Sequence, residues 1–328
     1  MIISRTPLRI SFFGGGTDYP DYFRSHGGQV LSTSIQKYSY INVRRLDPIF
    51  DFNYRISYSS LEVCKNVEEI RHPSVRECLK FLKMQGGIEV HYAGDLPART
   101  GLGSSSSFTV GLLHCLYGLS NIFVSHERLA SDAVFVEQEL IGERVGVQDQ
   151  YAAAFGGFNK IVFQKDGTVI VNPLVASRPR LEELKNHLML FYTGISRTAH
   201  EVLEEQVTRT KKGDNNSDLN TLFEMVNEAT EILTGSKDIR QFGELLHLAW
   251  ESKRRLSRSV SNPTIDSLYA SARGAGAIGG KLLGAGGGGF LLLFVEPHRQ
   301  NDIRNALHGY ASIDLEFDSD GSRIIYVG

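Results

Sequence analysis

The chain has 328 residues, a length that is typical of about two domains. Hydrophobic residues make up 41% and charged residues 22% of it, which is an ordinary globular composition. The formal net charge is −2, so no global basic field would attract nucleic acid or a membrane surface. We find neither a signal-peptide layout nor an apolar run near the roughly 18 residues of a membrane span. We therefore expect a cytoplasmic protein without nucleic-acid or membrane partners.

The first half of the chain reads as strands, then helices, then a hairpin. Strands are predicted over 8–13, 38–44, 54–58 and 88–92, and helices over 74–84, 104–119 and 126–142. Apolar segments on either side of Asp166 and Gly167 predict a β-hairpin. Three scattered cysteines without CxxC spacing indicate reduced thiols rather than a zinc site or a disulfide framework.

The second half contains more helix. Strands are predicted over 188–192 and 290–295, and helices over 219–257, 263–275 and 297–309. The polar residues 211–218 are predicted to form a loop between two long helices. Strands and helices intermix without strict β–α–β alternation, which predicts an α+β protein with antiparallel sheets. We place the division between its two domains after residue 178, giving domains 1–178 and 179–328.

A glycine turn followed by four serines, residues 97–107 (PARTGLGSSSS), is the most informative stretch of the chain. Glycines allow the backbone to approach an anion closely, and the apolar run after the serines predicts a helix that begins there. The free N–H groups of a first helical turn attract negative charge, and serine hydroxyls can reach a Mg²⁺ on phosphate oxygens. The spacing matches neither a Walker A loop nor a dinucleotide fingerprint. A phosphate cradle and a plain serine-capped helix both remain open.

Two further glycine clusters favour the phosphate cradle. Residues 14–16 are consecutive glycines between a predicted strand and the pair Thr17 and Asp18. They cost backbone entropy on folding, which favours close approach of a ligand over the alternative of a tight strand-to-helix turn. Asp18 can accept hydrogen bonds from sugar hydroxyls, and Arg9 can neutralise a phosphate. The third cluster, residues 284–289, precedes an apolar strand and suits a floor against substrate or phosphate.

Two carboxylates between these clusters are candidates for phosphoryl-transfer chemistry. One such group can ligate Mg²⁺ while another positions or deprotonates the attacking hydroxyl. Glu137 lies within a predicted helix, where the alternative is a solvated helix face. Asp149 lies in a glycine-containing segment, where the alternative is a turn or a helix N-cap.

Together and in this order, these motifs resemble those of the GHMP small-molecule kinases, which include galactokinase and the homoserine, mevalonate and phosphomevalonate kinases. The resemblance covers nearly the whole chain, with motifs at residues 5–18, 97–107 and 281–289. It implies a two-domain α+β fold that binds ATP and substrate in the cleft between the domains. It also implies an ATP-dependent enzyme that uses Mg²⁺ and phosphorylates a hydroxyl group.

The resemblance further implies a role for each matching position. Asp149 would face the sugar hydroxyl as the catalytic carboxylate, with Arg9 beside the reacting groups. Mg²⁺ would be held by Glu137 and by Ser104 or Ser105. The ATP phosphates would be wrapped by Pro97, Gly101, Leu102, Gly103, Ser104, Ser105, Ser106 and Ser107. The acceptor would lie against Gly14, Gly15, Gly16, Thr17, Asp18, Gly286 and Gly287.

The chain departs from the galactokinase-like motif at residues that would contact the acceptor. Galactokinase-like first motifs have Gly-Glu-His-Thr-Asp where this chain has residues 14–18, GGGTD. The missing negative charge and side-chain volume leave room for an anionic substituent such as a sugar phosphate. Residues 6–19 and 146–153 most resemble the bacterial D-glycero-D-manno-heptose 7-phosphate kinases. That resemblance implies phosphorylation of the anomeric hydroxyl to a 1,7-bisphosphate, on the way to nucleotide-activated heptose for surface polysaccharide.

Two alternatives stay open at this point. One is a kinase of an unphosphorylated sugar of the fucose or galactose type, and the other is a catalytically silent regulator that binds sugar and ATP. A 7-phosphate requires cations, for which the candidates are Arg24, Lys37, His72, Arg76, Arg197 and Lys253. We favour Arg197 because it lies in a loop after a predicted buried strand, where function is often found. The sequence makes no prediction of oligomeric state.

Overall fold

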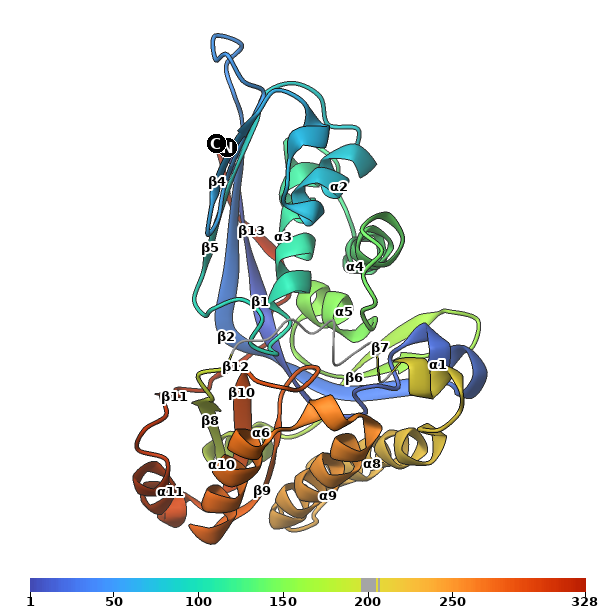
Figure 1. The fold of residues 1–328 in the computed structure, drawn as a ribbon, viewed down its shortest axis with the longest axis vertical. Coiled ribbons are helices and arrows are strands. Elements are labelled where there is room, and N and C mark those ends of the chain that lie inside the picture. Colours follow the sequence, from blue (N-terminus) through green and yellow to red (C-terminus); the bar gives the residue numbers. More distant parts are fainter. Residues whose placement is uncertain (196–204, 206) are drawn as a thin grey trace.

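The computed structural model describes residues 1–195, 205 and 207–328, and it contains two sheets with helices packed against them (Figure 1). The larger sheet has the strand order β13-β1-β2-β5-β3-β4, with β6 and β12 also paired to β2, and β7 to β6. Its strands are β1 (Ile2–Phe13), β2 (Gly28–Arg45), β3 (Tyr54–Ser57), β4 (Leu61–Cys64), β5 (Ile88–Gly94), β6 (Phe158–Phe163), β7 (Val169–Pro173), β12 (Phe317–Asp318) and β13 (Arg323–Val327). Its pairs are antiparallel apart from β3 with β5, so the expected α+β class is confirmed.

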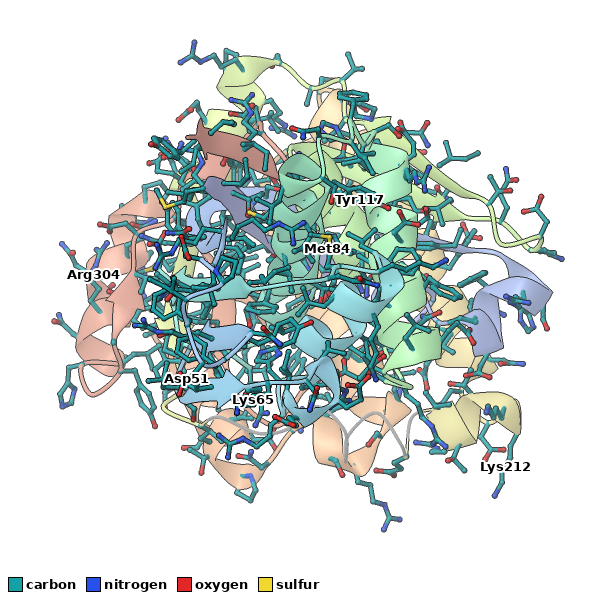
Figure 2. The ribbon with its side chains drawn as sticks, turned by 90° about the horizontal axis from the view of Figure 1, so that it is seen from above. Asp51, Lys65, Met84, Tyr117, Lys212 and Arg304 are labelled. Carbon is teal, nitrogen blue, oxygen red and sulfur yellow. The ribbon has the colours of Figure 1, made fainter. Side chains whose placement is uncertain are left out.

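Helices cover one face of this sheet (Figure 1). They are α2 (Pro73–Phe81), α3 (Ser104–Leu119), α4 (His126–Phe135) and α5 (Gln148–Phe155), while α1 (Pro20–His26) and the short η1 (Val67–Glu69) lie in the connections. The helix α3 is apolar almost all round and is therefore buried between the sheet and its neighbours. Seen from above, Tyr117 of α3 and Met84 lie inside the molecule, whereas Lys212 and Arg304 lie at its edge (Figure 2).

The smaller sheet has the order β11-β8-β10-β9 and is antiparallel. Its strands are β8 (Leu188–Tyr192), β9 (Ala277–Leu282), β10 (Phe290–Val295) and β11 (Ser312–Ile313). The accompanying helices are α6 (Arg178–Asn186), α8 (Asn216–Thr234), α9 (Arg240–Leu256), α10 (Pro263–Gly274) and α11 (Gln300–Ala306), with short turns η3 (Arg258–Val260) and η4 (Pro297–Arg299). Every residue of β10 is buried, as its unbroken apolar run predicts.

The two sheets share a hydrophobic core at the end of β1. The rings of Phe12 and Phe13 contact the ring of Phe242 on α9, with centroids 5.4 and 5.1 Å apart, and all three residues are fully buried. Edge-on aromatic pairs of this kind stabilise beyond the area that they bury. The strand that carries Arg9 is therefore fixed to both halves of the molecule.

Three expectations need correction. Residues 317–327 were expected in the second domain, but β12 pairs with β2 and β13 with β1, so the chain returns to the first sheet. The predicted loop 211–218 is shorter, because α8 already begins at Asn216. The helix expected over 126–142 is regular only to Phe135 and continues as a π-helical turn, η2 (Val136–Leu140). The hairpin around Asp166 and Gly167 is confirmed.

Among the described residues, no helix has the length and apolar character that crossing a membrane requires.

Candidate functional site

An ion pair between Arg9 of β1 and Asp149 of α5 forms the centre of the candidate site. Arg9 donates through Nε to Oδ1 at 2.8 Å and through Nη2 to Oδ2 at 2.9 Å. Its Nη1 donates to the carbonyl of Gly101 at 2.7 Å, which ties the pair to the serine loop. The Arg9 side chain is 5% exposed and that of Asp149 25%. The arginine thus fixes the orientation of a carboxylate that remains open to a ligand.

Asp18 lies beside this pair and is almost completely buried. Its carboxylate accepts from the Gly16 N–H at 2.9 Å and from Gln148 Nε2 at 2.9 Å. Burial raises the pKa of Asp18, and the charge of Asp149 raises it further, while these two hydrogen bonds oppose the shift. A side chain at position 146 would stand 1.9 Å from Asp18 Oδ2, which explains the glycine there. Sequence reasoning did not find the roles of Gly146 and Gln148.

The glycines of the first cluster differ in their surroundings. Gly14 has a φ of +82°, and a Cβ there would lie 2.0 Å from the carbonyl of Gln29 on β2. Thr17 donates its hydroxyl to the carbonyls of Gly14 and Gln29, at 2.8 and 2.9 Å, so it stabilises the turn. A Cβ at Gly15 would instead find only ordinary contacts at 3.8 Å, to Gln148 Nε2 and Ser11 Oγ.

Unsatisfied polar atoms border this open position. The hydroxyl of Ser11 and Oε1 of Gln148 are buried and have no hydrogen-bond partner among the described residues. Buried polar groups without partners cost free energy, so such groups mark places where a ligand can supply the partner. This arrangement surrounds Gly15, where the sequence predicted room for the acceptor.

The serine loop begins α3 without a serine cap. Gly103 is the N-cap residue, with a φ of +75° and no side-chain hydrogen bond to the helix. The alternative of a serine-capped helix is therefore wrong. The N–H groups of residues 104–106 have no acceptor within the helix and are available to an anion. Ser105 is exposed, whereas the Ser107 hydroxyl donates to the carbonyl of Pro7 at 2.8 Å.

Leu102 is the apolar member of this loop and is fully buried in the core between the sheets. Its carbonyl accepts from the Arg9 N–H at 3.0 Å. The Ser104 hydroxyl accepts from the Arg99 N–H at 3.3 Å, and Arg99 has a positive φ of 62°. These contacts hold the loop against β1.

The third glycine cluster packs on the serine loop, backbone against backbone. A Cβ at Gly101 would lie 2.4 Å from the carbonyl of Leu283, and one at Gly284 would lie 2.4 Å from the Cα of Gly101. Phe290 N–H also donates to the carbonyl of Thr100 at 3.2 Å. Only glycines permit so close an approach.

Gly286 and Gly287, which were expected to line the acceptor site, contact Val260 of η3. A Cβ at Gly286 would stand 2.7 Å from the Cα of Val260, and Gly287 N–H donates to the carbonyl of Val260 at 2.9 Å. Arg197, the favoured partner of a 7-phosphate, lies outside the described residues.

Glu137 lies in the π-helical turn and points into the protein. It is 1% exposed, so the solvated-face alternative is wrong. Its Oε2 accepts from Ser106 Oγ at 2.9 Å and from Gln150 Nε2. Burial raises the pKa of Glu137 to about 7, while the hydrogen bonds from Gln150 and Ser106 oppose the shift.

The second oxygen of this carboxylate suits a cation. Glu137 Oε1 is buried and has no hydrogen-bond partner among the described residues. A carboxylate oxygen and a nearby serine hydroxyl are hard oxygen donors of the type that Mg²⁺ prefers, with phosphate oxygens and water completing its shell. In the described part of the chain, no group of three or more His, Cys, Asp or Glu side chains could hold a metal by itself. The residues present therefore fit a Mg²⁺ that arrives with a nucleotide.

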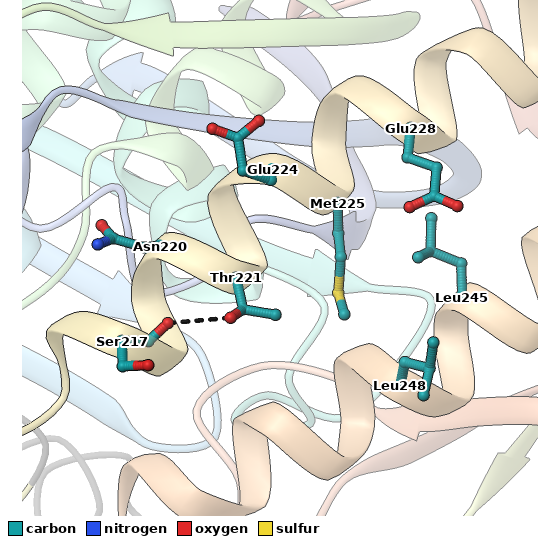
Figure 3. Close-up of a pocket in the computed structure, with 8 residues that line it drawn as sticks. All are labelled: Ser217, Asn220, Thr221, Glu224, Met225, Glu228, Leu245 and Leu248. Atoms are coloured by element: carbon teal, nitrogen blue, oxygen red, sulfur yellow. Dashed lines mark hydrogen bonds between the residues drawn. The ribbon is translucent and has the colours of Figure 1, made fainter.

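A groove of about 500 Å³ lies elsewhere, between α8 and α9 (Figure 3). Within it, Thr221 donates its hydroxyl to the carbonyl of Ser217 at 3.0 Å. Its lining residues are Ser217, Asn220, Thr221, Glu224, Met225, Glu228, Leu245 and Leu248. It contains none of the residues of the candidate site.

Comparison with known proteins gives matches along nearly the whole chain. The model of the GHMP kinases N terminal domain matches residues 71–157, and that of the GHMP kinases C terminal matches residues 226–312. A D-glycero-alpha-D-manno-heptose 7-phosphate kinase of Campylobacter jejuni is 33% identical over 98% of this chain and 97% of its own length. A bifunctional fucokinase/GDP-fucose pyrophosphorylase of Arabidopsis thaliana is 28% identical over 94% of this chain, but over only 31% of its own length.

Solved structures give the same fold. A D-glycero-D-manno-heptose 1-phosphate kinase from Bacteroides thetaiotaomicron has a TM-score of 0.82 at 23% identity, with full coverage of both chains. The galactokinase of Lactococcus lactis, complexed with galactose, has a TM-score of 0.75 at 20% identity, over 98% of this chain and 94% of that one. These relatives define the class of the protein, which is a sugar kinase. The chain belongs to the GHMP kinase family.

Proposed function

We propose that the chain transfers the γ-phosphoryl group of ATP to the anomeric hydroxyl of a D-glycero-D-manno-heptose 7-phosphate, giving the 1,7-bisphosphate. The observation that carries the proposal is the Arg9–Asp149 pair, fixed at two points and placed against the serine loop. The 33% identity to a heptose 7-phosphate kinase over nearly all of both chains supports the choice of acceptor. The missing side chains at Gly15 and Gly16 support an anionic acceptor as well.

The proposed chemistry assigns one task to each element. The free N–H groups of residues 104–106 and the helix dipole of α3 hold the triphosphate. Asp149 orients the anomeric hydroxyl and takes its proton as the sugar oxygen bonds to the γ-phosphorus and the bond to ADP breaks. Arg9 holds Asp149 in place and offsets the negative charge of the reacting groups.

A divalent cation would be held by Glu137 and by the hydroxyl of Ser104 or Ser105. When bound, it supplies positive charge against the phosphate oxygens of the nucleotide. Ser106 already donates to Glu137 and thereby orients its carboxylate. Asp18 and Gln148 present oxygen and nitrogen atoms to sugar hydroxyls beside the open position at Gly15.

A second acceptor class is an unphosphorylated sugar. The fucokinase relative, at 28% identity, favours it. A coupled ADP-release assay across heptose 7-phosphate, heptose, fucose and galactose separates the two. We expect kcat/KM for heptose 7-phosphate to exceed that for heptose by at least a hundredfold. Equal values for the two heptoses would contradict the proposed acceptor.

A further inference from the structure

Two buried lysines bring their ammonium groups to the junction of the glycine clusters. Lys253 of α9 donates through Nζ to the carbonyl of Leu282 at 3.2 Å and also to that of Gly284. Lys281 of β9 donates through Nζ to the carbonyl of Phe12 at 2.8 Å, at the end of β1. The two lysines are only 8% and 5% exposed.

Neither lysine forms an ion pair with a carboxylate in the described part of the chain, since their recorded partners are all carbonyls. The neighbouring carboxylates are engaged elsewhere, Asp149 by Arg9 and Asp18 by Gly16 and Gln148. In its protonated form each lysine has three N–H donors. The carbonyls use two donors of Lys253 and one of Lys281, so contacts with the described residues leave three of the six for a ligand.

The surroundings of the two lysines disfavour their protonation while no anion is bound. Burial lowers the pKa of Lys253 to about 7, and Arg9 lowers it further, while Asp18 opposes the shift. Burial, Lys253 and Arg9 together hold the pKa of Lys281 well below its usual value. Buried charges normally have a partner of opposite sign, because leaving them unpaired is costly. A bound anion would supply that partner and would allow both side chains to hold a proton.

We propose that Lys253 and Lys281 form a binding site for a phosphoryl group, within the kinase reaction proposed above. A phosphate dianion offers several acceptor oxygens in a small volume, which matches three free donors on two adjacent cations. The site joins the loop at Gly284, which packs on Gly101, to the end of β1 that leads into the first glycine cluster. The phosphoryl group is either the phosphate already on the acceptor or the one transferred from ATP.

Steady-state kinetics of Lys253→Met and Lys281→Met tests the proposal and separates the two sources. If the acceptor phosphate binds here, each variant raises KM for the sugar phosphate at least tenfold and changes KM for ATP less than threefold. If the transferred phosphoryl group binds here, kcat falls at least tenfold on whichever sugar the enzyme accepts. In both cases Lys253→Arg, which keeps the charge, recovers part of the loss.

A second test measures proton uptake when a ligand binds. If the lysines were only structural, replacing them would not change this uptake. Calorimetric titration at pH 8, in two buffers of different ionisation enthalpy, uses the accepted sugar and a non-hydrolysable ATP analogue in turn. The groups that face Lys253 are Arg9, Asp18 and Lys281. Because Lys253 is largely neutral at pH 8 in the free protein, binding of a dianion draws a proton onto it. We expect measurable uptake by the wild type and less by Lys253→Met.

Lys165→Met, at an exposed position in the β6–β7 hairpin, is the matched control and should behave as wild type. If both buried variants lose only thermal stability, with kcat, KM and proton uptake unchanged, the lysines are structural tethers and the proposal is wrong. If the wild type accepts only unphosphorylated sugars, the proposed acceptor fails. The kcat and ATP-analogue measurements still decide on the lysine site in that case.

Discussion

Arg9 and Asp149 meet through two parallel hydrogen bonds although 140 positions separate them in the chain. Arg9 Nη1 also donates to the carbonyl of Gly101. A single side chain therefore sets the relative position of strand β1, helix α5 and the serine loop. Planar two-point pairing is specific to arginine, because lysine offers only a point charge. The carboxylate that we assign to the acceptor hydroxyl is therefore oriented before any ligand binds.

Replacing the proposed base should affect the rate more than nucleotide binding. We expect Asp149→Asn to lower kcat by about 10²- to 10⁴-fold, since it removes the proton acceptor. KM for ATP should change less than threefold, because Asp149 does not belong to the serine loop. Asp51→Asn, at an exposed position, is the control. A variant with nearly full kcat would show that Asp149 is not the base.

Two adjacent glycines should respond differently to the same substitution. Gly14→Ala places a methyl group 2.0 Å from the Gln29 carbonyl at a positive φ, so we expect a folding defect or a loss of several °C in Tm. Gly15→Ala meets only contacts at 3.8 Å and should fold normally. Because that methyl group occupies the proposed acceptor space, KM for the sugar phosphate should rise at least fivefold.

A charged substitution at Gly15 tests the charge of the proposed acceptor more directly than Gly15→Ala does. Gly15→Glu restores the carboxylate of galactokinase-like motifs and opposes an anionic acceptor. We expect kcat/KM for heptose 7-phosphate to fall more than that for unphosphorylated sugars. A parallel fall for all sugars would argue against a phosphate near Gly15.

Glu137 should determine the response to Mg²⁺. Glu137→Gln keeps the side-chain shape and removes the charge, so we expect the Mg²⁺ concentration for half-maximal rate to rise at least tenfold. The maximal rate should also fall, because a carboxylate oxygen is lost from the proposed metal site. Titration of Mg²⁺ at fixed ATP measures both effects. An unchanged Mg²⁺ dependence would exclude Glu137 as a ligand.

His114 of α3 should make stability depend on pH. Burial lowers its pKa from 6.5 to about 4, with nearby His126 as the lesser cause. Below pH 6.5 the unfolded chain takes up a proton on this side chain and the folded protein does not, so stability falls as pH falls toward 4. Between pH 6.5 and 5 the loss is at most about 2 kcal/mol.

Urea unfolding at pH 7.5 and pH 5 measures this dependence. Between pH 7.5 and pH 5, His114→Asn should lose up to about 2 kcal/mol less stability than the wild type. His308→Asn, at an exposed histidine, should follow the wild type. If His114→Asn and the wild type showed parallel losses, the histidine would not be the cause.

Local patterns allowed much of the fold to be predicted. The hairpin at Asp166 and Gly167, the apolar strand β10 and the start of α3 at Ser104 depend on neighbouring residues, and the structure confirms them. The return of residues 317–327 to the first sheet depends on pairing with β1 and β2, which no local pattern encodes. The π-helical turn around Glu137 was not predicted either, because residues 126–142 were expected to form one regular helix.

In the candidate site, too, some features were predictable from the sequence and others were not. Arg9 and Asp18 were proposed because they flank a glycine cluster, whereas the roles of Glu137 and Asp149 were implied by the resemblance to the GHMP kinases. The contacts of Gly284 with Gly101, and of Gly286 with Val260, were not predictable, because a glycine needed for backbone packing looks like one needed for a ligand. Lys281 stood within a recognised motif, yet only the structure shows that its ammonium group has no carboxylate partner among the described residues.

The pairing of β13 with β1 has a consequence for biosynthesis. Residues 2–5, at the start of the strand that carries Arg9, take their outer neighbours from residues 323–327. During translation this edge stays open until some three hundred further residues have left the ribosome, whereas α3 and its neighbours can already pack. The strand that carries Arg9 thus gains its outer neighbour last, and an interrupted synthesis yields a protein with an exposed strand edge, which invites aggregation.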